Sequence, residues 1–206
     1  MKKIQNLEVS KFRVENSLKD DYLEQMLKLD ESNYSEDDKG TYSMCMDWYS
    51  VNNDIYIILL YDNKVVGYIN FIALTKEAYQ KFKTAQIRDT DLTSKDILPF
   101  VADKENYCLF MSIVIHPNFR NGDAVKILTK AWQYKLQQLE KKGVKIKSIL
   151  ADCVSEDGER YIKRLGFESV IATSHDSIIY EKSLRINSKS QTIERESCQN
   201  KEKPLL

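Results

Sequence analysis

The segment YCLFMSIVI, residues 107–115, is the most apolar run of the chain and constrains its fold more than any other feature. A strand that is covered on both faces has a near-continuous apolar sequence, whereas a half-exposed strand alternates between apolar and polar residues. The run therefore predicts a central strand of a sheet that carries other elements on both faces.

A hairpin is predicted just before this strand. Two runs rich in β-branched and aromatic residues, 55–61 and 65–73, flank the pair Asp62-Asn63. Asp and Asn tolerate the positive φ angles of a two-residue hairpin turn. The two runs are therefore expected to form paired antiparallel strands.

Hydrophobic periodicity and cap residues predict the remaining elements. Helices are expected over residues 18–30, 36–49, 76–84 and 123–142, and from a Ser155 cap through Leu165 to a stop at Gly166. Strands are expected over residues 146–152, 169–173 and 177–181. Between residues 85 and 106 the pattern predicts an irregular connection. The order indicates an α/β domain with a mixed, mostly antiparallel sheet that is split between the strands 107–115 and 146–152.

The domain is expected to span residues 1–183. With 206 residues and 42% hydrophobic residues, the chain is long enough for one full-sized core and short for two. From residue 184 to 206 the composition becomes polar and charged, so this segment cannot bury enough apolar surface to offset its ordering entropy. A disordered tail is predicted there.

Composition argues against several function classes. Lys plus Arg and Asp plus Glu both number 31, so the basic surplus typical of nucleic-acid binders is missing. The four cysteines have no short metal-ligand spacing, which argues against a zinc site. No apolar run is long enough for a bilayer, and the N-terminal lysines precede no secretory h-region. We expect a cytoplasmic protein with no membrane or nucleic-acid partner.

Three stretches, in order, carry a resemblance to the GNAT (GCN5-related N-acetyltransferase) superfamily. The hairpin that ends in VVGYINF (65–71) looks like the family's second and third strands, and IVIHPNFRNGDAVKIL (113–128) looks like its strand-loop-helix coenzyme motif. ERYIKRLGFESV (159–170) is similar to its penultimate helix and Gly-Phe turn. The resemblance implies the acyl-CoA N-acyltransferase fold and direct transfer of an acetyl group from acetyl-CoA to a primary amine, without a metal. A homodimer stays open, and the identity of the amine is not implied.

The coenzyme motif has a physical rationale. A diphosphate needs several converging N–H donors, and the first turn of a helix supplies unpaired ones. Gly122 and the small Ala124 allow the backbone to approach a ligand closely. Phe119 occupies the family's basic position and Arg120 follows one place late, while the Asp123 carboxylate would repel a diphosphate. A degenerate, purely structural turn is the alternative.

The resemblance further implies a set of coenzyme-binding residues. The strand end would offer main-chain groups to the pantetheine arm, and Ser155 stands where relatives often carry a polar residue that touches the coenzyme. Ser155 is also a plausible helix N-cap, which is its structural alternative. The implied set is Ile113, Val114, Ile115, Arg120, Asn121, Gly122, Asp123, Ala124, Val125 and Ser155.

The expected general acid is displaced by one residue. Many relatives carry a tyrosine four residues before the glycine of the Gly-Phe turn, and Ile162 occupies that position here. Tyr161 is its neighbour, and one residue rotates a helical side chain by about 100°. Tyr161 is therefore a candidate catalytic acid and, alternatively, an ordinary amphipathic tyrosine.

Acids in the connection between residues 85 and 106 admit two interpretations. Asp89, Asp91 and Asp96 would attract a cationic amine near a cleft or would lie on a solvated loop. Two rival functions stay open for the whole chain. One is a catalytically inactive acyl-CoA sensor or protein-interaction module with the same fold, and the other is an unrelated α+β interaction domain.

Overall fold

The computed structural model describes residues 8–34, 39–120 and 122–184. Its helices are α1 (Asp20–Asp30), α2 (Tyr42–Val51), α3 (Lys76–Lys83), α4 (Asp123–Lys141) and α5 (Glu156–Arg164). Its strands are β1 (Phe12–Glu15), β2 (Tyr56–Tyr61), β3 (Lys64–Leu74), β4 (Ile97–Leu98), β5 (Glu105–Ile115), β6 (Lys145–Cys153), β7 (Glu168–Ala172) and β8 (Ile178–Ser183). Short 3₁₀ turns cover Val9–Lys11, Asp89–Asp91 and Pro117–Phe119.

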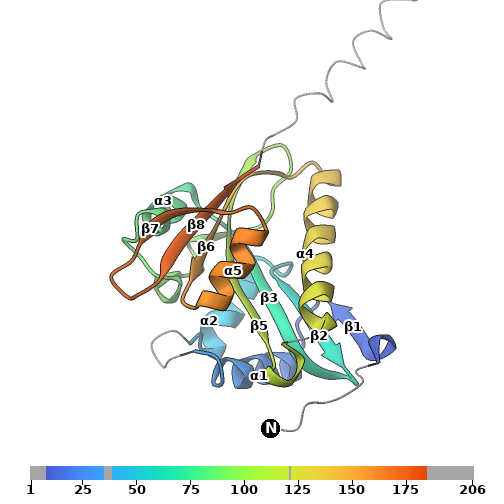
Figure 1. The fold of residues 1–206 in the computed structure, drawn as a ribbon. Coiled ribbons are helices and arrows are strands. Elements are labelled where there is room, and N and C mark those ends of the chain that lie inside the picture. Colours follow the sequence, from blue (N-terminus) through green and yellow to red (C-terminus); the bar gives the residue numbers. More distant parts are fainter. Residues whose placement is uncertain (1–7, 35–38, 121, 185–206) are drawn as a thin grey trace, which may run out of the picture.

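The strands form one mixed sheet in the order β1-β2-β3-β5-β6-β8-β7, and β4 pairs with the end of β3 (Figure 1). Each described strand pair is antiparallel except β5 with β6, which is parallel. The most apolar run of the sequence, β5, lies in the middle of this order. The predicted mixed, mostly antiparallel sheet with flanking helices is confirmed.

The predicted hairpin is confirmed together with its turn. Asp62 and Asn63 connect β2 to β3 with φ angles of 49° and 63°, the conformation that a two-residue type I′ turn requires. Further along β3, Gly67 lies against β5 and α4. A β-carbon at Gly67 would be 2.8 Å from the carbonyl oxygen of Val114, so only glycine fits this close approach of two strands.

Strands β1 and β4 are absent from the sequence prediction. β1 is a four-residue edge strand with two charged side chains, and only its pairing with β2 identifies it as a strand. α2 begins at Tyr42 rather than at residue 36, because Thr41 caps the helix by accepting a hydrogen bond from the Met44 N–H at 3.2 Å. Residues 35–38 lie outside the described residues.

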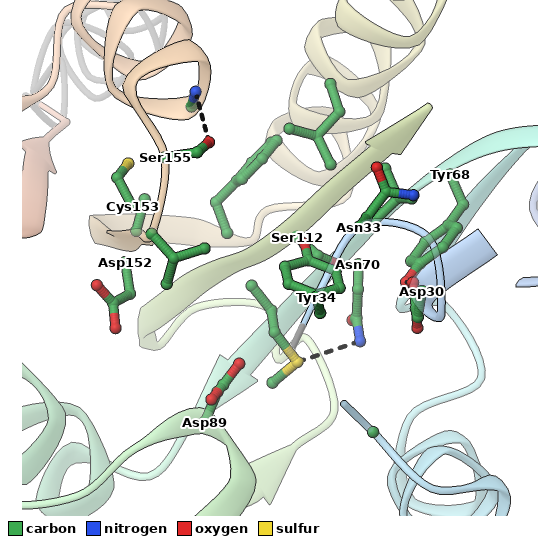
Figure 2. A pocket seen from close by; sticks show the side chains of 18 of the residues that line it. Asp30, Asn33, Tyr34, Tyr68, Asn70, Asp89, Ser112, Asp152, Cys153 and Ser155 are labelled. Carbon is green, nitrogen blue, oxygen red and sulfur yellow. Dashed lines mark hydrogen bonds between the residues drawn. The ribbon is translucent and has the colours of Figure 1, made fainter. Parts of the chain in front are cut away.

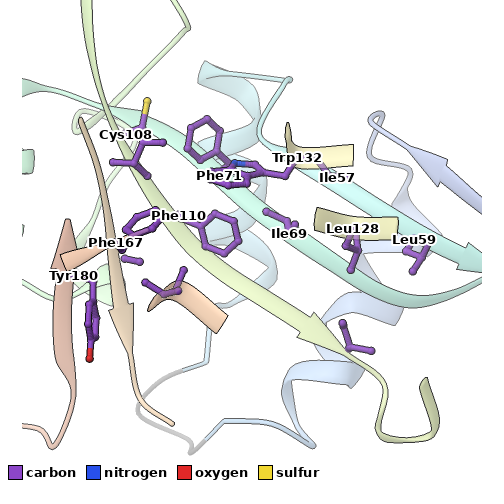
Figure 3. Close-up of a cluster of buried hydrophobic side chains, with 14 of the residues drawn as sticks. Ile57, Leu59, Ile69, Phe71, Cys108, Phe110, Leu128, Trp132, Phe167 and Tyr180 are labelled. Carbon is purple, nitrogen blue, oxygen red and sulfur yellow. The ribbon is translucent and has the colours of Figure 1, made fainter. Parts of the chain in front are cut away.

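Each face of the sheet packs a separate core. On one face, the α4 and α5 side chains Leu128, Trp132 and Ile162 pack on the strands, and the rings of Phe71 and Phe110 meet Trp132 edge to face (Figure 3). On the other face, α1, α2 and α3 contribute another set of buried side chains, Tyr22, Met26, Trp48, Tyr79 and Phe82. The two layers enclose the central strands on both sides.

The sheet splits between β5 and β6, as predicted. Their parallel pairing ends at Leu109 and Leu150, whereas β5 continues to Ile115. Opposite β3, the register skips Met111, because Ser112 pairs with Asn70 and Phe110 with Phe71. A bulge bends a strand, so Met111 marks the point at which β5 turns away from β6. Main-chain groups of β5 beyond Leu109 that face β6 thus have no strand partner among the described residues.

Leu184, the last described residue, lies one position after the expected domain boundary of 183. The Leu184 N–H donates to the Lys147 carbonyl at 3.0 Å, and the Leu184 side chain packs against the α4-side core. The rest of the predicted tail, residues 185–206, lies outside the described residues. Over the described ranges, no helix has the combined length and apolar character needed to cross a bilayer.

Candidate active site

A cavity of about 740 Å³ runs through the split between β5 and β6. It reaches α4 and α5 on one side of the sheet and α1, α2 and the turn Asp89–Asp91 on the other. Figure 2 shows Ser155 at one end of the cavity, Asp30 and Tyr68 at the other, and β5 with Ser112 between them. Two molecules that enter from opposite faces of the sheet can therefore meet beside β5.

Tyr161 lies in the wall of this cavity on the α5 side. Its phenol oxygen is 3.1 Å from the Thr129 hydroxyl, which donates to the Val125 carbonyl at 2.7 Å. Because the Thr129 proton is used in that bond, the Tyr161 phenol is the donor to Thr129. Burial raises the pKa of Tyr161, and the Thr129 hydrogen bond lowers it by less. The phenol is protonated at neutral pH, as an acid must be.

The neighbouring residue, Ile162, also lines the cavity but is buried more deeply. Ile162 is 3% exposed and packs in the α4-side core with Phe110 and Phe167. The one-residue displacement seen in the sequence therefore does not remove a tyrosine from the cavity, because Tyr161 and Ile162 both line it.

The predicted coenzyme residues divide into two groups. Those that line the cavity are Ile113, Val114, Ile115, Arg120, Val125 and Ser155. Gly122, Asp123 and Ala124 lie at the start of α4 outside the cavity wall, and Asn121 lies outside the described residues. Ser155 is the N-cap of α5 and accepts from the Gly158 N–H at 3.2 Å, so its structural role is confirmed.

The start of α4 combines features that favour anion binding with features that oppose it. Gly122 is the N-cap residue and brings no side chain to satisfy the first-turn N–H groups. Asp123 follows, with its carboxylate 3.2 Å from the Lys126 ammonium. Arg120 turns away from α4: its Nε donates to the Ile115 carbonyl at 3.3 Å and its guanidinium also bonds Asn33 of the α1 end. Ala124 is fully buried.

Polar side chains line the sheet face under α1 and α2. Asn70 on β3 and Asp152 on β6 each lie between two residues that pack in the α4-side core, so both point to the opposite face. Ser112 on β5 is paired with Asn70. Asn70 Oδ1 and Asp152 Oδ1 are buried and have no hydrogen-bond partner among the described residues. The other Asp152 oxygen lies 3.5 Å from His175 Nε2.

Asp30, at the C-terminal end of α1, completes this side. The side chain is 7% exposed, and Tyr68 donates to its Oδ1 at 2.5 Å. Burial raises the pKa of Asp30 to about 6, while the Tyr68 hydrogen bond and the Lys39 charge lower it by less. At neutral pH the cavity therefore contains a buried carboxylate, an arrangement that clusters at functional sites.

The acids of the connection separate into two roles. Asp91 accepts from the Arg88 N–H at 2.8 Å and Asp96 from the Thr93 N–H at 2.9 Å, so both cap local turns. Asp89 lines the cavity. Asp91 and Asp96 thus belong to a solvated loop, as the solvated-loop alternative predicted. Of the three acids, Asp89 alone lies at the cavity, as the cleft alternative predicted.

Sequence reasoning did not identify Asp30, Asn70 or Asp152. The available signal was a polar residue inside an otherwise apolar strand, as in GYINF and ILADC. Whether such a polar residue faces the cavity depends on which face of the sheet it occupies, and the face follows from the register of the strands. No group of three or more potential metal ligands occurs in the part of the chain that the structure describes.

Comparison with known proteins identifies the fold. No protein-family model and no curated protein matches the sequence. Solved structures do match, among them the NatC complex bound to Gag peptide and CoA, with a TM-score of 0.59 and 9% identity over 85% of this chain and 99% of that one.

Two further matches agree with the first. Ard1 from Thermoplasma volcanium has a TM-score of 0.57 and 12% identity, over 85% of this chain and 99% of that one. Arabidopsis thaliana Naa50 with the bisubstrate analogue CoA-Ac-MVNAL has a TM-score of 0.55 and 14% identity, over 84% and 99%. At such identities the likeness concerns the fold, which is that of the GNAT acetyltransferases; an unrelated α+β fold is excluded.

Proposed function

We propose that this chain is an N-acetyltransferase that transfers an acetyl group from acetyl-CoA directly to a primary amine. The observation that carries the proposal is the continuous cavity through the β5–β6 split, which opens toward α4 and α5 on one face and toward α1 and α2 on the other. The GNAT fold supports the reaction class, although one fold hosts several functions and sets only a prior.

The α4–α5 side is proposed to hold acetyl-CoA, which supplies an acetyl group activated as a thioester. The residues proposed to hold it are those implied by the sequence motif: Ile113, Val114, Ile115, Arg120, Asn121, Gly122, Asp123, Ala124, Val125 and Ser155. The unpaired edge of β5 offers main-chain donors and acceptors. The uncapped start of α4 offers N–H groups to the diphosphate, and Asp123 weakens that attraction without blocking it, because Lys126 partly neutralises the carboxylate.

Tyr161 is proposed as the acid. It lines the cavity, its phenol is protonated at neutral pH, and its present acceptor, Thr129, is a neutral hydroxyl from which the proton can be redirected. An acid of this kind contributes about 10²–10⁴-fold to a rate. Acyl-enzyme chemistry is not proposed: burial raises the pKa values of Cys45, Cys108 and Cys153, which disfavours their thiolates.

The test measures coenzyme binding and turnover separately. Binding of acetyl-CoA to the native state must raise the melting temperature, and incubation with a panel of primary amines should release CoA. Thermal stabilisation without CoA release on any amine would instead support the inactive acyl-CoA sensor. Neither stabilisation nor heat of binding at millimolar acetyl-CoA would overturn the transferase assignment.

A further inference from the structure

The hairpin of β7 and β8, which lies beside β6 (Figure 1), brings a histidine to the cavity wall. His175 lies in the turn of this hairpin and lines the cavity, as does Asp152 of β6. Thr173 holds the turn, because its hydroxyl oxygen accepts hydrogen bonds from the backbone N–H groups of His175 and Ser177, both at 3.3 Å. The Thr173 and Ser177 hydroxyls are also 2.8 Å apart. The backbone that carries His175 is therefore held at the edge of the cavity.

Asp152 lies beside this turn because β6 pairs with β8. Asp152 is paired with Ile179, and its Oδ2 lies 3.5 Å from His175 Nε2. It comes after Leu150, the last β6 residue paired with β5, so the two side chains lie on the β6 side of the split. An amine that approaches the free edge of β5 from the α1–α2 side meets this pair across the split.

The pair has the arrangement of a base and the carboxylate that orients it. A carboxylate that faces Nε2 favours the imidazole tautomer with its proton on that nitrogen, so the lone pair lies on Nδ1. Among the described residues, the ring makes no other hydrogen bond or ion pair. The 3.5 Å separation exceeds the usual N–H···O distance of about 2.7–3.2 Å, and catalytic contacts often shorten when a substrate binds. Nδ1 of His175 can therefore accept a proton from a ligand.

The other charged residues in this half of the cavity are already engaged. Asp30 accepts a hydrogen bond from Tyr68 at 2.5 Å, and Arg88 and Asp89 have partners of their own within the chain. Tyr161, the proposed acid, belongs to the α4–α5 side. A base at His175 would thus act on the acceptor side of the sheet and the acid on the coenzyme side.

We propose that His175 is the general base that deprotonates the acceptor ammonium, and that Asp152 positions its imidazole. This assignment rests on the proposed function. His175 takes one proton from the R–NH₃⁺ group and later passes it to water. The neutral amine then forms the C–N bond with the acetyl carbon, and the C–S bond of the thioester breaks with its electron pair on sulfur. The thiolate takes the Tyr161 proton, and the second proton lost by the nitrogen restores the phenol.

The basicity of the acceptor tests this assignment at a constant pH of 7.5. Ethylamine is almost entirely an ammonium ion at this pH, whereas trifluoroethylamine is almost entirely neutral and needs no base before it attacks. His175→Gln should lower kcat/KM for ethylamine about 10²-fold and that for trifluoroethylamine only a few-fold, with an unchanged affinity for CoA by calorimetry. His116→Gln is the matched control, because His116 is the other histidine of the chain and does not line the cavity.

A double-mutant cycle tests the carboxylate. Asp152→Asn should lower kcat/KM for ethylamine about tenfold and should have little further effect in a chain that carries His175→Gln, because Asp152 acts through the imidazole. In His175→Ala, imidazole added to the solution should restore part of the rate with ethylamine. Circular dichroism verifies that each variant is folded.

The outcomes separate the base from the transferase function. Equal losses on both amines in His175→Gln, or additive losses from the two substitutions, would remove the base and leave the transferase function in place. Thermal stabilisation by acetyl-CoA without wild-type turnover of either amine, or of any other amine in the panel, would remove the transferase function and the base together.

Discussion

The Tyr161 phenol donates a hydrogen bond to the Thr129 hydroxyl at 3.1 Å, which connects α5 to the first turns of α4 at the cavity wall. The contact fixes the tyrosine ring beside Phe110 of β5, with ring centroids 6.2 Å apart. A single bond thus determines where the candidate acid lies relative to the split in the sheet.

Removal of the Tyr161 hydroxyl should lower the rate of acetyl transfer and leave the fold unchanged. Tyr161→Phe keeps the ring packing and is expected to lower kcat for acetyl transfer by about 10²-fold, with a small change in the KM for acetyl-CoA. Since burial raises the pKa of Tyr161, wild-type activity should not decline through this group until the pH exceeds 10. Tyr134→Phe, at a residue 62% exposed on α4, is the control. Equal kcat for Tyr161→Phe and wild type would exclude Tyr161 as the acid.

Asp123 should oppose coenzyme binding while it stabilises α4. Asp123→Asn removes a negative charge from the helix start, so the affinity for CoA should rise about two- to fivefold by calorimetry, and the free energy of unfolding should fall by about 0.5 kcal/mol. Glu140→Gln removes the same charge near the other end of α4 and should not tighten CoA binding. Unchanged or weaker CoA binding by Asp123→Asn would place the diphosphate away from this corner.

Asp30 should make the protein less stable as the pH rises. Its pKa is about 6 in the folded protein and near 3.8 when unfolded, so between these values the folded state binds the additional proton. Stability from this group is therefore present below pH 4 and is lost as the pH rises through 6. The cost at pH 7.5 is up to about 3 kcal/mol.

The variant Asp30→Asn tests that cost. Denaturant unfolding should show a higher free energy of unfolding than wild type at pH 7.5 and little difference at pH 4, while Asp47→Asn, at an exposed acid on α2, should follow wild type throughout. A stability difference independent of pH would indicate that folding does not shift the pKa of Asp30. Burial raises the pKa of Tyr68, the hydrogen-bond donor to Asp30, so its phenol stays protonated throughout this range.

Gly67 should tolerate no side chain. Gly67→Ala would place a β-carbon 2.8 Å from the Val114 carbonyl oxygen and 3.2 Å from Leu128, so β3 and β5 would have to separate. We expect a loss of about 1–3 kcal/mol in the free energy of unfolding. Gly158→Ala, in helix α5, is the comparison: alanine favours a helix by about 1 kcal/mol, and its close neighbour is the Ser155 hydroxyl. Similar losses at both positions would contradict the close approach at Gly67.

Local sequence determined most elements of this protein. The Asp62-Asn63 turn, the Ser155 cap and the apolar run of β5 are each set by neighbours within a few residues, and each occurs where it was predicted. β1 and β4 were missed because they are short edge strands that become strands only through pairing with β2 and β3.

Tertiary structure alone decided the polar residues on the α1–α2 side of the candidate site. Asp30, Asn70 and Asp152 come from α1, β3 and β6, and no spacing in the sequence relates them. Their convergence depends on the register between β3 and β5, on the bulge at Met111 and on which face of the sheet each side chain occupies. A shift of β3 by one residue in that register would turn Asn70 to the opposite face, and the same shift of β6 would turn Asp152, so only long-range pairing could assemble them.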